Sequence, residues 1–333
     1  MTVIRWGIVG VGDVTEVKSG PGFQKARNSE LVAVMRRNGA LAEDYAARHS
    51  VPRWYDDAGA LIADPDVDAV YIAAPPYVHK EYTLMCARAG KPVLVEKPMA
   101  LNFAECQQMG EACAAAGVPL WVAFYRRALP RFLKIKALID EGAIGRAQSV
   151  VIKLYMPPPS AGAEPDWKFT PRFSGGGKFV DMAVHTLDFL DFVFGSIQAA
   201  QGLTAKHADL YEAEDHVVAS FQFETGLLGV GDWYFTSREY VDETRIVGTE
   251  GEVAFSTFDS TPIRLTTAAG SEAIAVENPP HVHQPLIQTI VDELNGVGAC
   301  PSPGVSGART TWVTDQILRG TNTALNPKPP FPT

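Results

Sequence analysis

Residues 3–15 read Val-Ile-Arg-Trp-Gly-Ile-Val-Gly-Val-Gly-Asp-Val-Thr, an apolar run that leads into closely spaced glycines. The run predicts a buried strand over residues 3–9, then a tight turn and a helix that begins near Gly12. Glycines at positions 10 and 12 allow the backbone to approach a pyrophosphate, and a helix N-terminus favours its negative charge. Thr15 stands where the dinucleotide fingerprint has glycine or alanine, so the match is partial. The candidate phosphate-loop residues are Gly10, Gly12, Asp13 and Val14, and a plain tight turn is the alternative.

Strand-like and helix-like segments alternate from this loop to residue 123. Strands are expected over 30–35, within 66–74, and over 92–96 and 118–123, with helices over 40–49, 79–89 and 103–116. The Ser19-Gly20-Pro21-Gly22 insert predicts a turn that interrupts the first helix. This alternation predicts an α/β fold with a Rossmann-type doubly wound parallel sheet, in which ligands bind at the carboxyl ends of the strands.

The end of the second strand bears on the choice of cofactor. Arg36 and Arg37 follow Met35, where an NAD-preferring site usually has an acidic residue for the ribose hydroxyls. Two guanidinium groups suit a 2′-phosphate, which a carboxylate would repel. We therefore expect NADP(H) to be favoured over NAD(H). The alternative is that both arginines are solvated residues in a turn.

The next two strand ends supply further cofactor-binding candidates. Pro75 and His79 follow the third strand, at a position where a cofactor-facing loop is expected. Glu96-Lys97-Pro98 follows the fourth strand, and charged residues are unusual there because burial without partners is costly. Lys97 is expected at the carboxyl edge, close to a nicotinamide. A structural salt bridge between Glu96 and an arginine is the alternative.

A second stretch with candidate chemistry runs from Gly175 to Asp188. Three glycines precede apolar residues at helical spacing, which predicts a loop followed by a helix. Asp181, His185 and Asp188 then share one helical face. Because a carboxylate can orient an imidazole and stabilise its protonated form, Asp181 and His185 are a candidate acid/base pair. The alternative is a helix start with Asp181 in its first turn and a packing histidine at position 185.

Composition restricts the class of protein and its partners. The chain has 333 residues, a formal net charge of −9 and a pI near 5.3, which argues against nucleic-acid and anionic-membrane partners. The amino terminus shows no targeting segment and no run reaches membrane-spanning length, so a cytoplasmic location is expected. Four cysteines form neither a CxxC pair nor a disulfide framework. His281 and His283 lack accompanying carboxylates or cysteines, so they are expected to be loop histidines, and no metal site is predicted.

Taken in order, Gly10–Gly12, Glu96-Lys97-Pro98 and the stretch from Gly175 to Asp188 resemble the glucose–fructose oxidoreductase / inositol dehydrogenase / rhizopine catabolism (Gfo/Idh/MocA) family of NAD(P)-dependent oxidoreductases. The resemblance covers nearly the whole chain. It implies that Lys97 lies beside the nicotinamide and reaches the substrate oxygen. It also implies that Asp181 and His185 form the opposite wall, with His185 as proton donor or acceptor. These roles are coherent because hydride transfer at a carbon requires its oxygen to gain or lose a proton.

A second domain over residues 124–333 is expected to bind substrate and to form oligomers, after a dinucleotide-binding domain over 1–123. Alternating runs at 216–223 and 227–235 predict an antiparallel hairpin, which segments 244–247 and 251–256 extend into a large, mainly antiparallel sheet. Helices near 285–295 and 308–318 are expected to close this α+β domain. The family resemblance implies that the open face of the sheet forms the interface of a homodimer or homotetramer.

Besides Asp181 and His185, four further residues are candidates for contacting the substrate. The resemblance implies that Tyr125 and Arg126 approach the pocket, while Arg127 is as consistent with an ion pair that ties the domains together. The proline-rich loop 156–169 is expected to form a lid or pocket wall. Trp167 and Lys168 within it can offer a stacking face and a donor to a sugar, although Trp167 can equally anchor the loop.

The expected function is therefore an NADP(H)-dependent oxidoreductase. It would transfer hydride between nicotinamide and a secondary alcohol or carbonyl of a small sugar, sugar derivative or related diol. Two alternatives use the same fold. One is a noncatalytic NAD(P)-binding regulator, and the other is a redox-assisted lyase or glycosidase that retains its cofactor.

Overall fold

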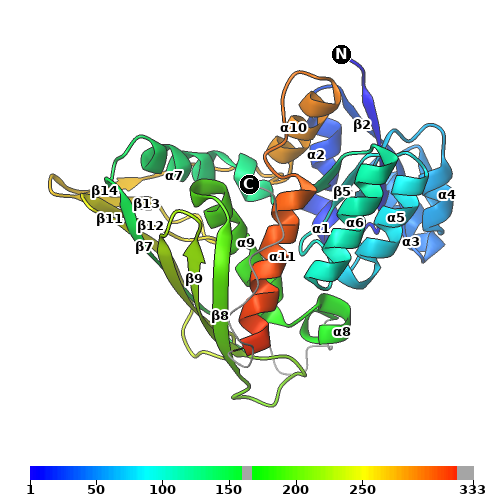
Figure 1. Cartoon of the computed structure of the whole chain (residues 1–333). Helices are drawn as coiled ribbons and strands as arrows, with labels where there is room; N and C mark the ends of the chain where they lie inside the picture. The colour runs from blue at the N-terminus through cyan, green and yellow to red at the C-terminus, as the bar shows by residue number, and fades with distance from the viewer. Residues whose placement is uncertain (160–166, 321–333) are drawn as a thin grey trace. The chain divides into compact units, whose positions relative to one another are not determined.

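The computed structural model describes residues 1–159 and 167–320, and the chain divides into two compact units (Figure 1). The first unit comprises residues 1–129 and 278–308. The second begins with residues 130–277 and resumes at Arg309, so the boundary falls inside the last helix, α11 (Gly304–Arg319). Residues 124–129 and 278–308, which the sequence placed in the second domain, thus lie in the first unit.

The first unit contains a six-stranded parallel sheet of order β3-β2-β1-β4-β5-β6. Its strands are β1 (Ile4–Val9), β2 (Ser29–Met35), β3 (Arg53–Tyr55), β4 (Ala69–Ile72), β5 (Val93–Val95) and β6 (Leu120–Val122). The strand order reverses between β1 and β4, and this switch is where ligands of such sheets bind. The predicted Rossmann-type sheet is confirmed, and the short edge strand β3 was missed.

Helices accompany the strands of the first unit. They are α1 (Asp13–Val17), α2 (Gly20–Lys25), α3 (Gly39–Arg48), α4 (Ala58–Ala63), α5 (His79–Arg88), α6 (Phe103–Ala116) and α10 (Gln284–Leu294), with 3₁₀ turns η1 (Pro76–Val78) and η2 (Tyr125–Ala128). The side chains of Asn38, Asp57 and Asn102 cap α3, α4 and α6, each by accepting a backbone N–H. Alternate residues of β1 face opposite ways, so Trp6 joins the core with Phe23, whereas Gly7 lies close to Leu61 of α4.

Two predictions about helices in this unit need correction. The first helix is interrupted after Val17, as predicted, but Gly20, Pro21 and Gly22 form the first turn of α2, with proline in its preferred first positions, rather than the interrupting turn itself. Helix α10 was expected to close the second domain, but Leu286, Ile287, Ile290 and Val291 are buried in the core of the first unit. Figure 1 shows α10 beside α2, and the close approach of Gly22 to Ile287 allows this packing.

The second unit contains an eight-stranded sheet of order β14-β13-β12-β11-β7-β10-β9-β8. Its strands are β7 (Ala147–Tyr155), β8 (Ile197–Ala205), β9 (His216–Phe223), β10 (Leu228–Tyr234), β11 (Val241–Gly248), β12 (Gly251–Phe255), β13 (Ile263–Thr267) and β14 (Gly270–Ile274). Neighbouring strands are antiparallel except β7 and β10. The predicted mainly antiparallel sheet is confirmed, with β8, β13 and β14 as additional strands.

Helices pack on one face of this sheet and leave the other face open. The helices of the second unit are α7 (Pro130–Asp140), α8 (Pro171–Ser174), α9 (Lys178–Phe194) and the later part of α11, with the 3₁₀ turn η3 (Trp167–Phe169). Phe189 of α9 contacts the rings of Phe132 and Phe255 at centroid distances of 4.9 and 5.7 Å. On the opposite face Val218 and Val230 are 43% and 48% exposed. Across the described ranges, no helix is both long enough and apolar enough to cross a membrane.

Candidate active site

The loop after β1 has the geometry that a pyrophosphate requires. Gly10 has a φ of +98°, and a Cβ atom added there would lie 2.8 Å from the backbone nitrogen of Ala74. Position 10 therefore requires glycine. An added Cβ on Gly12, by contrast, would meet nothing within 4 Å, which leaves open space over this part of the loop. The loop fits a dinucleotide, with close backbone approach and room for the phosphates.

The hydrogen bonds of Thr15 explain why a threonine stands where the dinucleotide fingerprint has glycine or alanine. Its Oγ1 donates to the carbonyl oxygen of Gly12 at 2.8 Å and accepts the Gly12 N–H at 2.9 Å. The buried hydroxyl thus closes the turn at the start of α1, because glycine has no side chain with which to cap it. Asp13, which is exposed, and the half-buried Val14 are the first two residues of that helix.

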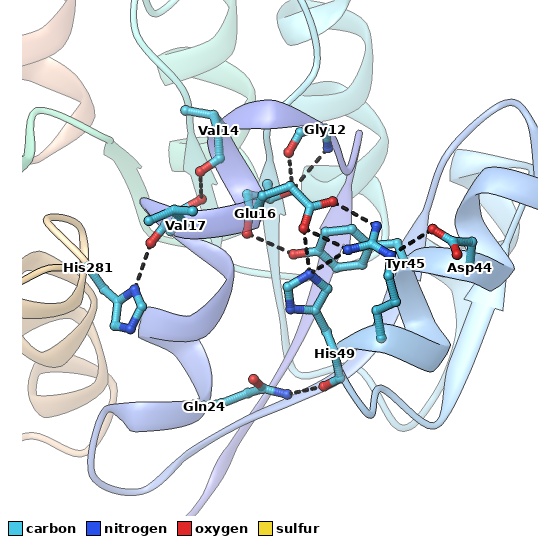
Figure 2. Close-up of polar contacts among 12 residues, drawn as sticks. Gly12, Val14, Glu16, Val17, Gln24, Asp44, Tyr45, His49 and His281 are labelled. Carbon is cyan, nitrogen blue, oxygen red and sulfur yellow. Dashed lines mark hydrogen bonds and ion pairs between the residues drawn. The ribbon is translucent and has the colours of Figure 1, made fainter.

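A network of polar contacts braces α1 against α3 (Figure 2). Arg48 donates from Nη2 and Nη1 to the two oxygens of Glu16 at 2.8 and 2.9 Å, and His49 contacts the same carboxylate at 2.8 Å. The Arg48 hydrogen bonds lower the pKa of Glu16 to about 2. The Tyr45 hydroxyl also donates to the Thr15 carbonyl at 2.8 Å. The helix that follows the glycine loop is therefore fixed from its outer side.

Arg36 and Arg37 lie exposed immediately after β2. Asn38 caps α3, so the two arginines occupy the short connection between the end of the strand and the helix. Among the residues that the structure describes, neither guanidinium takes part in an ion pair. The arrangement is compatible with an anionic ligand group at this strand end.

His79 joins two loops at the carboxyl edge of the sheet. It is fully buried, with Nε2 at 2.7 Å from the Ala74 carbonyl oxygen and Nδ1 at 3.1 Å from that of Pro98. Burial lowers the pKa of this imidazole. Pro75 immediately precedes η1 and lies at the same edge. These contacts show that His79 holds backbone in place, and its expected contact with cofactor remains a prediction.

The turn after β5 contains a buried carboxyl group. Glu96 is 7% exposed and accepts the Tyr71 hydroxyl at 2.5 Å and the Lys97 backbone N–H at 3.1 Å. Burial raises the pKa of Glu96, while the nearby Lys97 charge and the Tyr71 bond oppose that rise. These partners replace the arginine salt bridge considered from sequence. Lys97 itself is half-buried and follows the carboxyl end of the strand, as predicted.

The substrate candidates of the first unit lie in η2. Arg126 is 6% exposed, and its guanidinium lies 5.0 Å from the ring centre of Tyr125. Arg127 donates from Nη1 to the Pro301 carbonyl at 3.0 Å, which is a contact inside the first unit. Burial of both arginines indicates that η2 is a fixed element, and the role of Tyr125 and Arg126 in substrate binding remains a prediction.

In the second unit the predicted helix after the glycine triplet is confirmed as α9 (Lys178–Phe194). Asp181 lies in its first turn, and His185 is 5% exposed with its ring edge-on to Phe258 at 5.7 Å. Asp188, whose role was open, is 1% exposed and accepts the Thr310 hydroxyl at 3.3 Å. That contact indicates that Asp188 stabilises the packing of α9 with α11.

Trp167 and Lys168 belong to the short turn η3. The Lys168 ammonium lies 5.8 Å from the Trp167 ring centre, and both side chains are half-buried. Phe169 packs on Tyr211 with ring centroids 4.7 Å apart, so an aromatic contact anchors the turn. Residues 160–166 of the expected lid lie outside the described residues.

Two residues that contact Glu96, in the turn after β5, were not identified as site candidates from the sequence. Tyr71 lies within the predicted third strand and was not singled out, and His283 was treated with His281 as a loop histidine. The structure separates the two histidines, because the His281 Nδ1 contacts the Val17 carbonyl at 2.7 Å (Figure 2) whereas His283 is 3% exposed at the start of α10. Within the described part of the chain, no group of three or more His, Cys, Asp or Glu residues is arranged to hold a metal.

A glycine loop of this geometry on a six-stranded parallel sheet defines the class of NAD(P)-binding Rossmann proteins. Residues 4–124 match the model of the oxidoreductase family with an NAD-binding Rossmann fold, and residues 132–254 match the GFO/IDH/MocA C-terminal domain. The chain belongs to the Gfo/Idh/MocA family and is an oxidoreductase of the dehydrogenase/reductase type. The resemblance drawn from sequence is thereby confirmed.

Similar proteins span nearly the full length of the chain. Oxidoreductase P35 of Formosa agariphila is 39% identical over 94% of this chain and 97% of its own length. A 1,5-anhydro-D-fructose reductase of Ensifer adhaerens is 28% identical, with 92% of each chain covered. The structure of a levoglucosan dehydrogenase in complex with NADH and levoglucosan has a TM-score of 0.83 at 22% identity, covering 95% of this chain and 96% of that one. At this level of identity, the structural likeness shows a shared fold.

Proposed function

We propose that this protein is an NADP(H)-dependent oxidoreductase that acts on a secondary alcohol or carbonyl of a sugar, sugar derivative or related diol. The observation that carries the proposal is Lys97 at the carboxyl end of β5, in a sheet whose glycine loop fits a dinucleotide. Sugar-like substrates are favoured because relatives are named as a 1,5-anhydro-D-fructose reductase and a trans-1,2-dihydrobenzene-1,2-diol dehydrogenase.

The cofactor site would use three groups of residues. The backbone at Gly10 and Gly12 would accept the pyrophosphate, and Arg36 and Arg37 would bind the 2′-phosphate. The nicotinamide, when bound, supplies or accepts the hydride. The chain itself supplies the proton chemistry that must accompany hydride transfer.

Lys97 would donate a hydrogen bond to the substrate oxygen and stabilise negative charge that develops on it. His185 would give or take the proton, and Asp181 would orient the imidazole or hold a substrate hydroxyl. The buried surroundings of His185 favour a fixed ring orientation. Tyr125, Arg126, Trp167 and Lys168 would contact the rest of the substrate, with an aromatic face and donors suited to a polyhydroxylated molecule.

The decisive experiment is a panel of sugars and diols followed at the nicotinamide absorbance band. The wild-type protein should turn over at least one of them, and Lys97→Met and His185→Ala should each lower kcat/KM by about a hundredfold or more. Full activity of either variant would refute its assigned role. Cofactor binding without any turnover would favour the regulator, and product formation without net absorbance change would favour a lyase or glycosidase.

A homodimer or homotetramer formed through the open face of the sheet is part of the proposal. Support comes from Val218 and Val230, which stand exposed on neighbouring strands of that face. Expected partners are a small-molecule substrate and further copies of this chain, with neither nucleic acid nor membrane. The cytoplasmic location likewise remains a prediction.

A further inference from the structure

A buried histidine beside Glu96 has no role in the chemistry described so far. His283 is 3% exposed, and neither of its ring nitrogens has a hydrogen-bond partner among the described residues. Its backbone N–H donates to the Lys18 carbonyl at 3.1 Å, and its ring lies 4.4 Å from that of Tyr125 in an edge contact. Burying a polar group without a partner is unfavourable, because the group loses its hydrogen bonds to water, so this position requires an explanation.

Among the described residues, the ring of His283 lies close to the carboxyl group of Glu96. The His283 Nε2 lies 3.6 Å from Glu96 Oε1, the same oxygen that accepts the Tyr71 hydroxyl. A shift of about half an ångström would close this contact into a normal hydrogen bond. Tyr71, Glu96 and His283 therefore form one buried cluster, which we call the β5 cluster, and the Lys97 backbone N–H donates to its carboxyl group at 3.1 Å.

Charges around the ring determine which protonation state it holds. Lys18, Lys97 and Arg126 act on His283, and burial together with these cations lowers its pKa to about 3. The imidazole is therefore neutral at physiological pH, with one N–H to donate. A neutral donor facing a carboxylate stabilises the charged form of the acid. Tyr125 also faces the cluster through its ring contact with His283, and Tyr45 acts on the Tyr71 hydroxyl.

We propose that His283 is a positioning residue for Lys97: its neutral ring presents Nε2–H to Glu96 and keeps that carboxylate ionised beside the Lys97 amine. An ionised Glu96 favours the ammonium form of Lys97, which is the form that donates to a substrate oxygen. The assignment of His283 to catalysis rests on the proposed function, whereas its effect on Glu96 is a property of the protein alone.

The test measures protonation directly, with no turnover required. In protein labelled with ¹³C at the glutamate carboxyl and lysine Cε carbons, NMR titration gives the midpoints of Glu96 and Lys97, assigned from Glu96→Gln and Lys97→Arg spectra. His283→Phe should raise the Glu96 midpoint by about one pH unit, a tenfold change. His283→Gln keeps an N–H donor and should restore it, and His281→Ala, two residues away, should leave it unchanged.

The Lys97 amine supplies the second half of the test. Glu96→Gln should lower its deprotonation midpoint by about one pH unit, because the amide removes the neighbouring negative charge at every pH. An unmoved Glu96 midpoint in folded His283→Phe, or no restoration in His283→Gln, would overturn the inference. If His283→Phe does not fold, His283→Asn gives the same comparison, because its shorter amide falls short of Glu96. Shifted midpoints in a protein that reduces no sugar would refute the proposed function and leave the electrostatic role intact.

Discussion

Gly10 and Gly12 belong to one loop, but they differ in backbone conformation and in the space around the Cα atom. Gly10 needs a positive φ and close approach to Ala74, so Gly10→Ala should lower the free energy of unfolding by about 2 kcal/mol or more. Gly12 has an extended φ of −169° with open space around it, so Gly12→Ala should stay within about 1 kcal/mol of wild type.

Substitutions at Gly10 and Gly12 should also distinguish an effect on stability from an effect on cofactor binding. A methyl group at position 12 would occupy the space left for a phosphate, so Gly12→Ala should weaken NADPH binding at least about tenfold in a folded protein. Denaturant unfolding and NADPH fluorescence titration measure the two effects. Tight NADPH binding by Gly12→Ala would mean that the phosphates do not pass over this glycine.

Arg36 and Arg37 make the choice of cofactor testable with two substitutions. Arg36→Asp combined with Arg37→Ala removes two cations and adds a carboxylate that repels a 2′-phosphate. The ratio of kcat/KM for NADPH over NADH should fall about a hundredfold, because charge-assisted hydrogen bonds contribute about 1.5–3 kcal/mol each. Arg27→Ala, an exposed arginine before β2, is the matched control. An unchanged ratio would show that NADP(H) preference is wrong or has another origin.

At the level of elements, the contact of Glu16 with Arg48 fixes α1 on α3 and makes stability depend on pH. The pKa of Glu16 is about 2 in the folded protein against an ordinary value of 4.5. The contribution is therefore fully present above pH 4.5 and is lost as pH falls toward 2. Glu16→Gln should cost about 1 kcal/mol at neutral pH, because the pair is partly exposed, and progressively less in acid.

Urea unfolding of wild type and Glu16→Gln, at neutral pH and at about pH 3, measures this convergence. Glu43→Gln on the exposed side of α3 is the control and should match wild type at both values. A constant difference between wild type and Glu16→Gln across the pH range would show that the carboxylate charge does not stabilise the contact.

The elements that sequence predicted well are those with a strong local pattern. The apolar run before Gly10 predicted β1 at nearly the observed bounds, and the helical spacing after Gly177 predicted that α9 exists, although α9 continues beyond Asp188 to Phe194. Three-residue strands such as β3 (Arg53–Tyr55) carry too little periodicity to be read, and only pairing with β2 defines it. Ser19 to Gly22 looked like a turn because proline and glycines disfavour helix interiors, yet at a first turn proline is tolerated.

Residues of the candidate site likewise fall into those that a local sequence pattern indicates and those that only distant contacts define. Lys97 was selected because a charged residue is unusual at the end of an apolar strand, and Asp181 and His185 because their spacing places them on one helical face; the roles of all three remain predictions. Tyr71 and His283 were missed because each contacts Glu96 from a distant part of the sequence. Tyr71 is 25 residues from Glu96 and His283 is much farther, so no local sequence pattern predicts either contact. Helix α10 was assigned to the wrong domain for a related reason. Its apolar face predicts burial, but not which core receives it.

At the scale of the whole molecule, the open face of the eight-stranded sheet leads to the last prediction. Val218 and Val230 are 43% and 48% exposed on β9 and β10, with side chains on the face opposite α9. Isolated exposed valines are ordinary, but exposed apolar residues on adjacent strands favour association. Val218→Lys with Val230→Lys should therefore split the oligomer without unfolding it, since neither side chain belongs to the buried core.

Sedimentation velocity at micromolar concentration measures the outcome. Wild type should sediment as a dimer or larger species and the double variant as a smaller one, with thermal unfolding of the separated subunits still cooperative. Val297→Lys is the control, because that valine is 56% exposed and belongs to the first unit, which contains no strand of this sheet. A wild-type monomer would refute the oligomer itself. An oligomer that survives both lysines would place its interface on another surface, because two buried, unpaired ammonium groups cost more than such a contact can supply.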